Sequence, residues 1–87
     1  MWEIYEHRRL VRKLDSIPVD VLKRYEEWKD IVRLSGPQGL RQMKGLCDES
    51  LSGKWNGHRS SRLNLQYRVI YRIEEDKVFV QVVGYAP

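Results

Sequence analysis

The spacing of hydrophobic residues changes once along this chain, and that change sets the class of fold. Between residues 19 and 35 the apolar side chains recur every three or four positions, which is typical of one face of an α-helix: Val21, Tyr25, Trp28 and Val32. From residue 58 onward they recur every second position, which is typical of β-strands. With 87 residues, the chain has room for one small core. The sequence therefore predicts a single α+β domain over residues 1–87.

The second half predicts a three-strand antiparallel meander over residues 58–64, 66–74 and 77–84. Glu75-Asp76 has the length of a tight turn and would join the last two strands. In the middle strand one face would carry Tyr67, Val69, Tyr71 and Ile73. In the last strand one face would carry Val78, Val80 and Val82.

The first half predicts an N-terminal strand and two helices. Residues 1–6 alternate apolar and acidic side chains, which indicates a fourth strand. A basic helical stretch over residues 7–14 precedes a second helix, which Pro18 would begin. A short helical turn is predicted at residues 39–44 and a loop at residues 45–57. Both helices should cover one face of the sheet, which leaves the other face partly open.

Positive charge is concentrated near the predicted meander. The chain has 16 basic and 12 acidic residues, for a net charge of +4. Residues 50–73 contain no acidic residue and five basic ones: Lys54, Arg59, Arg62, Arg68 and Arg72. Such a field suits a polyanion such as RNA or DNA. The alternative is a solvated basic face that only maintains solubility.

The composition narrows the classes of function. No run approaches the roughly 18 apolar residues of a membrane span, and the N-terminus lacks the apolar core of a signal peptide. The single cysteine, Cys47, excludes an internal disulfide and favours a reducing, cytoplasmic setting. Two histidines and one cysteine are too few for a metal site, and no cofactor motif is present, so we expect neither a metal nor a cofactor.

The remaining reactive groups suit phosphoryl transfer. Arginines on an open sheet face could neutralise the charge that builds on a pentavalent phosphorane. A carboxylate such as Glu49 could remove the proton of an RNA 2′-hydroxyl. Trp55 and Tyr67 could offer surfaces on which bases stack.

Several segments of the chain together resemble the RelE/ParE superfamily of bacterial toxin–antitoxin modules. They are Leu-Ser-Gly-Lys-Trp-Asn-Gly-His-Arg at 51–59, Arg-Leu-Asn at 62–64, Tyr-Arg-Val-Ile-Tyr-Arg-Ile-Glu-Glu-Asp at 67–76 and the valine-rich strand at 78–83. The predicted order of elements matches too, so the resemblance covers essentially the whole chain. It implies a RelE-like fold and an mRNA endonuclease that acts in the ribosomal A site. Its partners would be an antitoxin, the ribosome and mRNA.

The resemblance also suggests site residues. The catalytic candidates are Glu49 as general base, with Arg62 and Arg68 toward the RNA phosphate. Glu49 stands where YoeB-type toxins carry a glutamate, although Ser50 replaces the proline that follows it there. The candidates for RNA contacts are Lys54, Trp55, His58, Arg59, Tyr67, Arg72 and Tyr85. Each has a purely structural alternative: Arg68 a strand ion pair, Glu49 a solvated loop position, His58 packing at a strand start.

One departure keeps a second function open. The ribonuclease branches carry a histidine or tyrosine after the last strand, as general acid or stacking group. Here only Tyr85 stands near that position. The alternatives are therefore a ParE-like inhibitor of DNA gyrase, which binds without catalysis, or an inactive or shortened ribonuclease variant. A third is a basic domain that only binds RNA or a partner.

Overall fold

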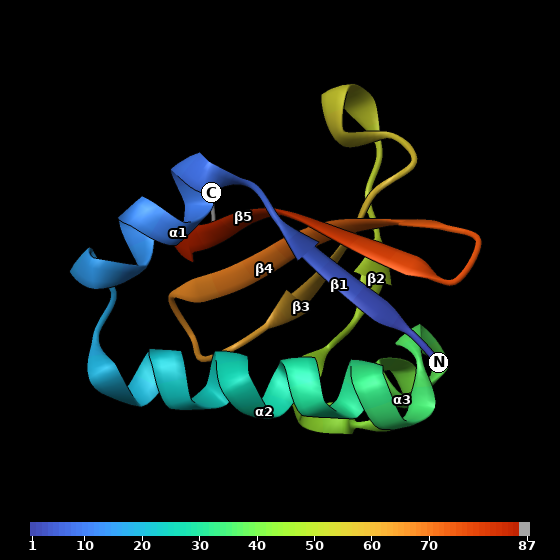
Figure 1. The fold of residues 1–87 in the computed structure, drawn as a ribbon, viewed down its shortest axis with the longest axis horizontal. Coiled ribbons are helices and arrows are strands. Elements are labelled where there is room, and N and C mark those ends of the chain that lie inside the picture. Colours follow the sequence, from blue (N-terminus) through green and yellow to red (C-terminus); the bar gives the residue numbers. More distant parts are fainter. Residues whose placement is uncertain (86–87) are drawn as a thin grey trace.

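Residues 1–85, which the computed structural model describes, form a five-stranded sheet with helices against one of its faces (Figure 1). The strand order is β1-β5-β4-β3-β2, with β1 at Glu3–Glu6, β2 at Glu49–Ser50, β3 at Arg59–Arg62, β4 at Tyr67–Glu74 and β5 at Lys77–Tyr85. The α-helices are α1 at Arg8–Lys13, α2 at Val19–Ser35 and α3 at Pro37–Gln42. Short 3-10 turns are η1 at Leu14–Ser16, η2 at Lys44–Leu46 and η3 at Gly53–Trp55. The predicted α+β class is confirmed, and no described helix is long and apolar enough to cross a membrane.

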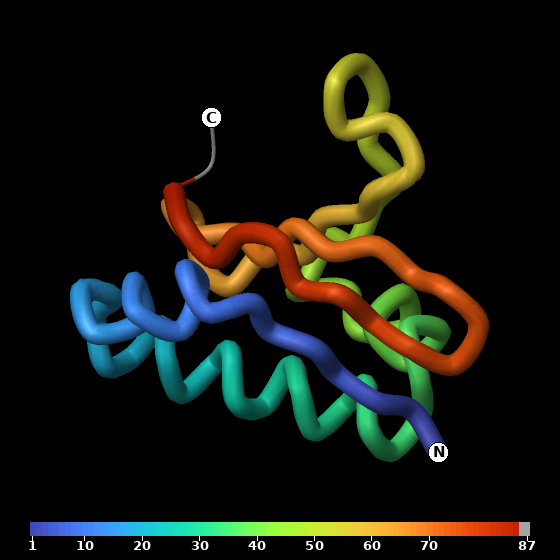
Figure 2. Tube along the Cα trace, turned by 45° about the horizontal axis from the view of Figure 1, so that its top comes forward, coloured from blue at the N-terminus to red at the C-terminus, as the bar shows by residue number. Residues whose placement is uncertain are grey.

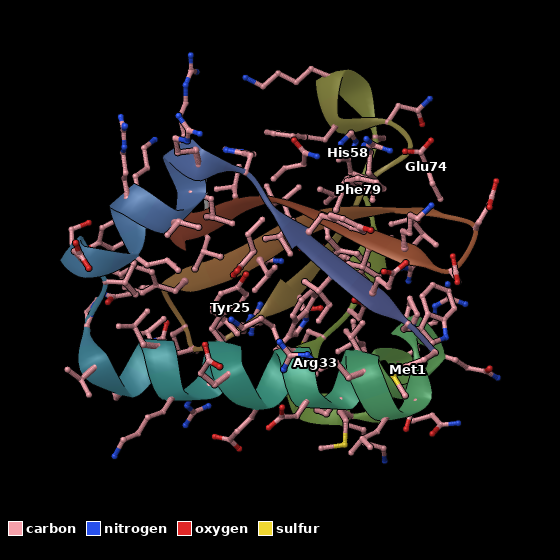
Figure 3. All side chains as sticks on the ribbon, in the orientation of Figure 1. Met1, Tyr25, Arg33, His58, Glu74 and Phe79 are labelled. Atoms are coloured by element: carbon pink, nitrogen blue, oxygen red, sulfur yellow. The ribbon has the colours of Figure 1, made fainter. Side chains whose placement is uncertain are left out.

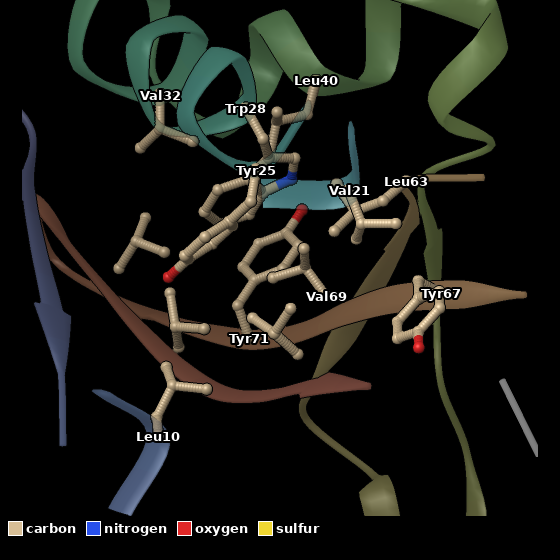
Figure 4. Packing of buried hydrophobic residues seen from close by; sticks show 13 residues of the cluster. Leu10, Val21, Tyr25, Trp28, Val32, Leu40, Leu63, Tyr67, Val69 and Tyr71 are labelled. Carbon is tan, nitrogen blue, oxygen red and sulfur yellow. The ribbon is translucent and has the colours of Figure 1, made fainter. Parts of the chain in front are cut away.

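Helix α2 supplies the centre of the core, and its predicted buried face is confirmed. Val21, Tyr25, Trp28 and Val32 are all fully buried. The Trp28 ring centroid lies 5.9 Å from that of Tyr25 and 5.3 Å from that of Tyr71 in β4 (Figure 4). Burying an apolar side chain of this size contributes about 1.5–3 kcal/mol. This aromatic cluster therefore holds α2 on the sheet.

The apolar alternation along β5 changes at a β-bulge, which the sequence did not predict. Tyr71 pairs with Val80 and Ile70 pairs with Val82, so the intervening Gln81 has no partner in β4. After one extra residue the side chains change faces. Val83 therefore shares the core face with Val78 and Val80, whereas Val82, predicted on the same face as those two valines, does not. The predicted face was right for Val78 and Val80 only.

Strand β1 is confirmed, and it pairs with β5 in parallel, from Glu3 opposite Lys77 to Glu6 opposite Val80. In Figure 2 the N-terminal strand runs along the last strand of the chain, at one edge of the sheet. The arrangement of the helices differs from the prediction that both would cover one face of the sheet. Helices α2 and α3 cover one face, whereas α1 lies beside the end of β5 and buries only Leu10 (Figure 1).

Residues 45–57, predicted as a loop, contain the edge strand β2 and the turn η3. Strand β2 pairs antiparallel with β3, so the sheet has a fifth strand beyond the predicted meander. Between β2 and β3 the chain rises away from the sheet on the side opposite α2 (Figures 1 and 2). We call residues 51–58 the protruding loop. It borders the sheet face that the helices leave uncovered, which we call the open face.

Candidate active site

A pocket of about 220 Å³ lies where the protruding loop meets the open face. Ser60 in β3 pairs with Ile70 in β4, so their side chains lie on one face of the sheet. The side chain of Arg68, two residues before Ile70, lies on the same face. Glu49 in β2 pairs with Ser60 and joins the same row. The pocket is lined by these four residues together with Leu51 and Trp55. Three residues predicted from the sequence, Glu49, Arg68 and Trp55, therefore come together.

Glu49 and Arg68 face each other across the pocket. Arg68 Nη1 lies 3.6 Å from Glu49 Oε1 and donates a 2.9 Å hydrogen bond to Ser60 Oγ. The Arg68 side chain is 22% exposed and that of Glu49 is 60% exposed. A guanidinium has five N–H donors, so Arg68 keeps further donors for an anion. The arrangement offers a carboxylate that can accept a proton beside a held cation.

The protruding loop contributes an aromatic ring to the pocket and carries an exposed lysine. Lys54 is exposed in η3. Trp55 lines the pocket, and the His58 ring meets it edge to face at 5.2 Å between centroids. In Figure 3, His58 lies above the sheet, on the side away from α2. Aromatic rings beside a pocket and a lysine on the adjoining loop are suited to stacking bases and contacting phosphates.

The other face of β2 and β3 carries a buried carboxylate that sequence analysis missed. The Asp48 side chain is 0% exposed. Arg59 Nε donates to it at 2.7 Å, Ser61 Oγ at 2.7 Å and the Tyr71 hydroxyl at 2.5 Å. Burial and Asp48 together raise the pKa of Tyr71 above its usual value. We call these four residues the Asp48 clamp. No sequence pattern marks Asp48, because its partners come from two strands distant in the chain.

Arg59, predicted to contact RNA, is turned away from the pocket into the Asp48 clamp. Burial lowers and the bond to Asp48 raises the pKa of Arg59, and the net change is upward. Arg62, predicted as catalytic, lines a different cavity of about 360 Å³ with Arg24, Glu27 and Trp28 of α2. Neither residue lines the pocket between Glu49 and Arg68.

The remaining predicted contacts lie away from the pocket. Tyr67 is 8% exposed and belongs to the core cluster, and the Tyr85 ring stacks on it at 4.7 Å. Arg72 does share the open face with Arg68. Its guanidinium lies 4.2 Å from the centroid of the Phe79 ring and pairs with Glu74. Figure 3 shows Glu74 and Phe79 on this side of the sheet. Much of the charge of Arg72 is therefore already compensated.

Metal binding finds no support among residues 1–85, since they contain no group of three or more His, Cys, Asp or Glu side chains suitable for a metal ion. The chemistry available in the pocket is that of Glu49 and Arg68.

No protein-family model and no curated protein matches this sequence. Solved structures do match, and they define a class, the fold of small RelE-type toxins. The chain is similar to a YoeB-YefM complex from Staphylococcus aureus, with a TM-score of 0.74, 14% identity and coverage of 100% of this chain and 99% of the other. It is also similar to the archaeal RelE-RelB complex from Pyrococcus horikoshii, with a TM-score of 0.74, 22% identity and coverage of 97% and 93%.

YafQ from E. coli is similar as well, with a TM-score of 0.69, 16% identity and coverage of 98% of this chain and 93% of the other. These similarities span the whole chain. The predicted resemblance to the RelE/ParE superfamily is therefore confirmed at the level of the fold.

Proposed function

We propose that this protein is a metal-independent endoribonuclease toxin of a bacterial type II toxin–antitoxin module. The observation that carries the proposal is the pocket on the open face, where the Glu49 carboxylate lies 3.6 Å from the Arg68 guanidinium. The fold shared with YoeB, RelE and YafQ structures supports this class of protein. The choice of Glu49 and Arg68 as site residues rests on the predicted resemblance and on the geometry of the pocket.

In the proposed reaction, Glu49 removes the proton of an RNA 2′-hydroxyl. The 2′-oxygen attacks the adjacent phosphorus, and the bond from phosphorus to the 5′-oxygen breaks. Arg68 donates hydrogen bonds to the phosphate oxygens, on which negative charge increases during attack. The products are a 2′,3′-cyclic phosphate and a 5′-hydroxyl, whose oxygen takes a proton from solvent as it leaves, while Glu49 returns its proton to solvent, so that no proton or water is consumed overall. No step consumes water or requires a metal.

The substrate we propose is mRNA in the ribosomal A site. Lys54 and Trp55 would hold the strand beside the pocket, the lysine through a phosphate and the indole by stacking. Arg8, Arg9, Arg12 and Lys13 of α1 are exposed and add to the field that attracts RNA. The partner that restrains the toxin would be an antitoxin, since the similar structures include complexes of YoeB with YefM and of RelE with RelB.

Primer extension on mRNA after brief induction of the protein in bacteria tests this function. New 5′ ends within the codons of translated messages would support it. Glu49→Gln should abolish these ends, whereas Glu27→Gln on the exposed side of α2 should not. Intact transcripts with arrested growth would contradict the ribonuclease proposal. A DNA supercoiling assay would then show whether gyrase is the target.

A further inference from the structure

Strand β2 is too short to hold Glu49 in place through its own backbone. It contains two residues, paired as Glu49 with Ser60 and Ser50 with Arg59, and both of them are exposed. The chain enters it through Cys47, whose φ of 46° lies in the left-handed region. That conformation costs a non-glycine residue about 1–3 kcal/mol. Another interaction must therefore hold β2 against β3.

The Asp48 clamp can supply that interaction. The buried carboxylate accepts hydrogen bonds from Arg59 and Ser61 of β3 and from Tyr71 of β4. Hydrogen bonds that involve an ionised group are about twice as strong as neutral ones. A buried charge that lost these partners would be strongly unfavourable. The residue immediately before Glu49 is thus bound to two neighbouring strands.

Two consecutive serines of β3 join the clamp to the pocket. Ser61 faces the core and donates to Asp48, whereas Ser60 faces the pocket and accepts from Arg68. Glu49 lies directly opposite Ser60. The alternation of β-strand side chains therefore sets Asp48 behind the sheet and Glu49 in front of it. Movement of Asp48 along β3 would carry Glu49 away from Arg68.

We propose that Asp48 is a positioning residue, which holds Glu49 at its distance from Arg68 without contacting RNA itself. This inference rests on the proposed function in so far as it concerns the rate of cleavage. A displacement of about 1 Å in a catalytic group can reduce a rate about 100-fold. The clamp would therefore affect kcat and leave KM nearly unchanged.

The first test is a double-mutant cycle in a ribosome-dependent mRNA cleavage assay with the purified protein. Asp48→Asn should lower kcat about 100-fold, with KM changed less than about twofold. In a Glu49→Gln protein the same substitution should change the residual rate less than about threefold, because Glu49 no longer acts. If Asp48→Asn lowers the rate by the same factor in the wild-type protein and in Glu49→Gln, the proposal is wrong.

Loss of stability must be separated from loss of position. Ser61→Ala removes one donor of the clamp and keeps the Asp48–Arg59 pair. We expect this milder variant to lower kcat in the same direction, with the same dependence on Glu49. Val32→Ala creates a cavity under α2 and removes none of the hydrogen bonds to Asp48, so it should leave kcat unchanged while the protein remains folded. Equal losses of kcat in both variants would contradict the proposal.

A second measurement needs no catalytic activity. The Leu51 amide donates a 2.9 Å hydrogen bond to the His58 carbonyl oxygen, immediately after β2. In Ser61→Ala, hydrogen exchange at Leu51 should accelerate more than exchange at the amides of the central strand β4. If the two change equally, Asp48 does not position β2. If this local opening occurs but the wild-type protein cleaves no RNA, the positioning role stands and the proposed function fails.

Discussion

Arg68 carries the electrostatic part of the proposed reaction. Arg68→Glu would place a second carboxylate beside Glu49 and repel the phosphate. Loss of one donor that stabilises transition-state charge costs about 100- to 1,000-fold in rate, and we expect at least this loss. The ion pair with the 60% exposed Glu49 contributes at most about 1 kcal/mol to stability. Single-turnover cleavage measures the loss of rate, and thermal unfolding measures the change in stability. Arg33→Glu on α2 is the control. Cleavage that is retained in Arg68→Glu, or lost equally in Arg33→Glu, would exclude the contact between Arg68 and the phosphate.

Tyr71 should make the stability of the protein depend on alkaline pH. Burial and Asp48 raise the pKa of Tyr71 in the folded state, so folding favours the neutral phenol. This contribution is complete below the unfolded pKa of about 10 and is lost as the pH rises above it, by up to about 1.4 kcal/mol per pH unit. Tyr71→Phe should be less stable at neutral pH yet lose less stability above about pH 10. Urea unfolding of both proteins from neutral pH to above about pH 10 tests this prediction. Equal losses of stability with rising pH in Tyr71→Phe and the wild-type protein would contradict it.

Among the connections, the turn from α2 to α3 has no room for a side chain. Gly36 has a φ of 72°, and a Cβ there would overlap the Trp2 indole. Gly36→Ala should therefore destabilise the protein by about 2 kcal/mol or more, which lowers the melting temperature by at least about 8 °C. Gly45→Ala is the matched control, because an added Cβ there meets nothing within 4 Å. Similar melting temperatures for both variants would contradict this account.

The sequence predicts elements with their own hydrophobic period and misses those that depend on distant partners. Helix α2 and strand β4 were predicted because each has a continuous apolar row. Strand β2 was missed because its two residues, Glu49 and Ser50, are exposed and pair only through β3. The bulge at Gln81 was missed because an extra residue leaves no local signal in a run of valines.

The candidate site divides in the same way. Trp55 was predicted from the chemistry of its side chain, and Glu49 and Arg68 from their chemistry and the resemblance; the fold brings the three together. That Arg59 faces Asp48 could not be predicted, because alternation assigns a face only after the strand pairing is known. The roles of Glu49, Arg68 and Trp55 in RNA cleavage remain predictions.

For the molecule as a whole, positive charge lies on two regions, α1 and the strands with the protruding loop. RNA affinity should therefore fall steeply with salt, by about 0.7 logarithmic units per decade of salt for each phosphate contact to a single strand. Lys54→Gln should reduce this slope by about 0.7. Lys23→Gln, on the exposed side of α2, should leave it unchanged. Fluorescence anisotropy with 2′-O-methyl RNA, which lacks the nucleophile, measures the salt dependence of affinity for both variants. Equal slopes in Lys54→Gln and the wild-type protein would exclude a contact between Lys54 and a phosphate.

The parallel pairing of β1 with β5 has a consequence for the newly made chain. His7, just after β1, contacts the carbonyl oxygen of Gln81, 74 positions later. At about 5–20 residues per second of synthesis, β1 waits roughly 4 to 15 seconds for its partner. Until then the central strand β4 lacks its neighbour β5, and the open face is incomplete. A ribosome that is still translating the first 80 residues of this protein therefore carries a chain without a finished sheet.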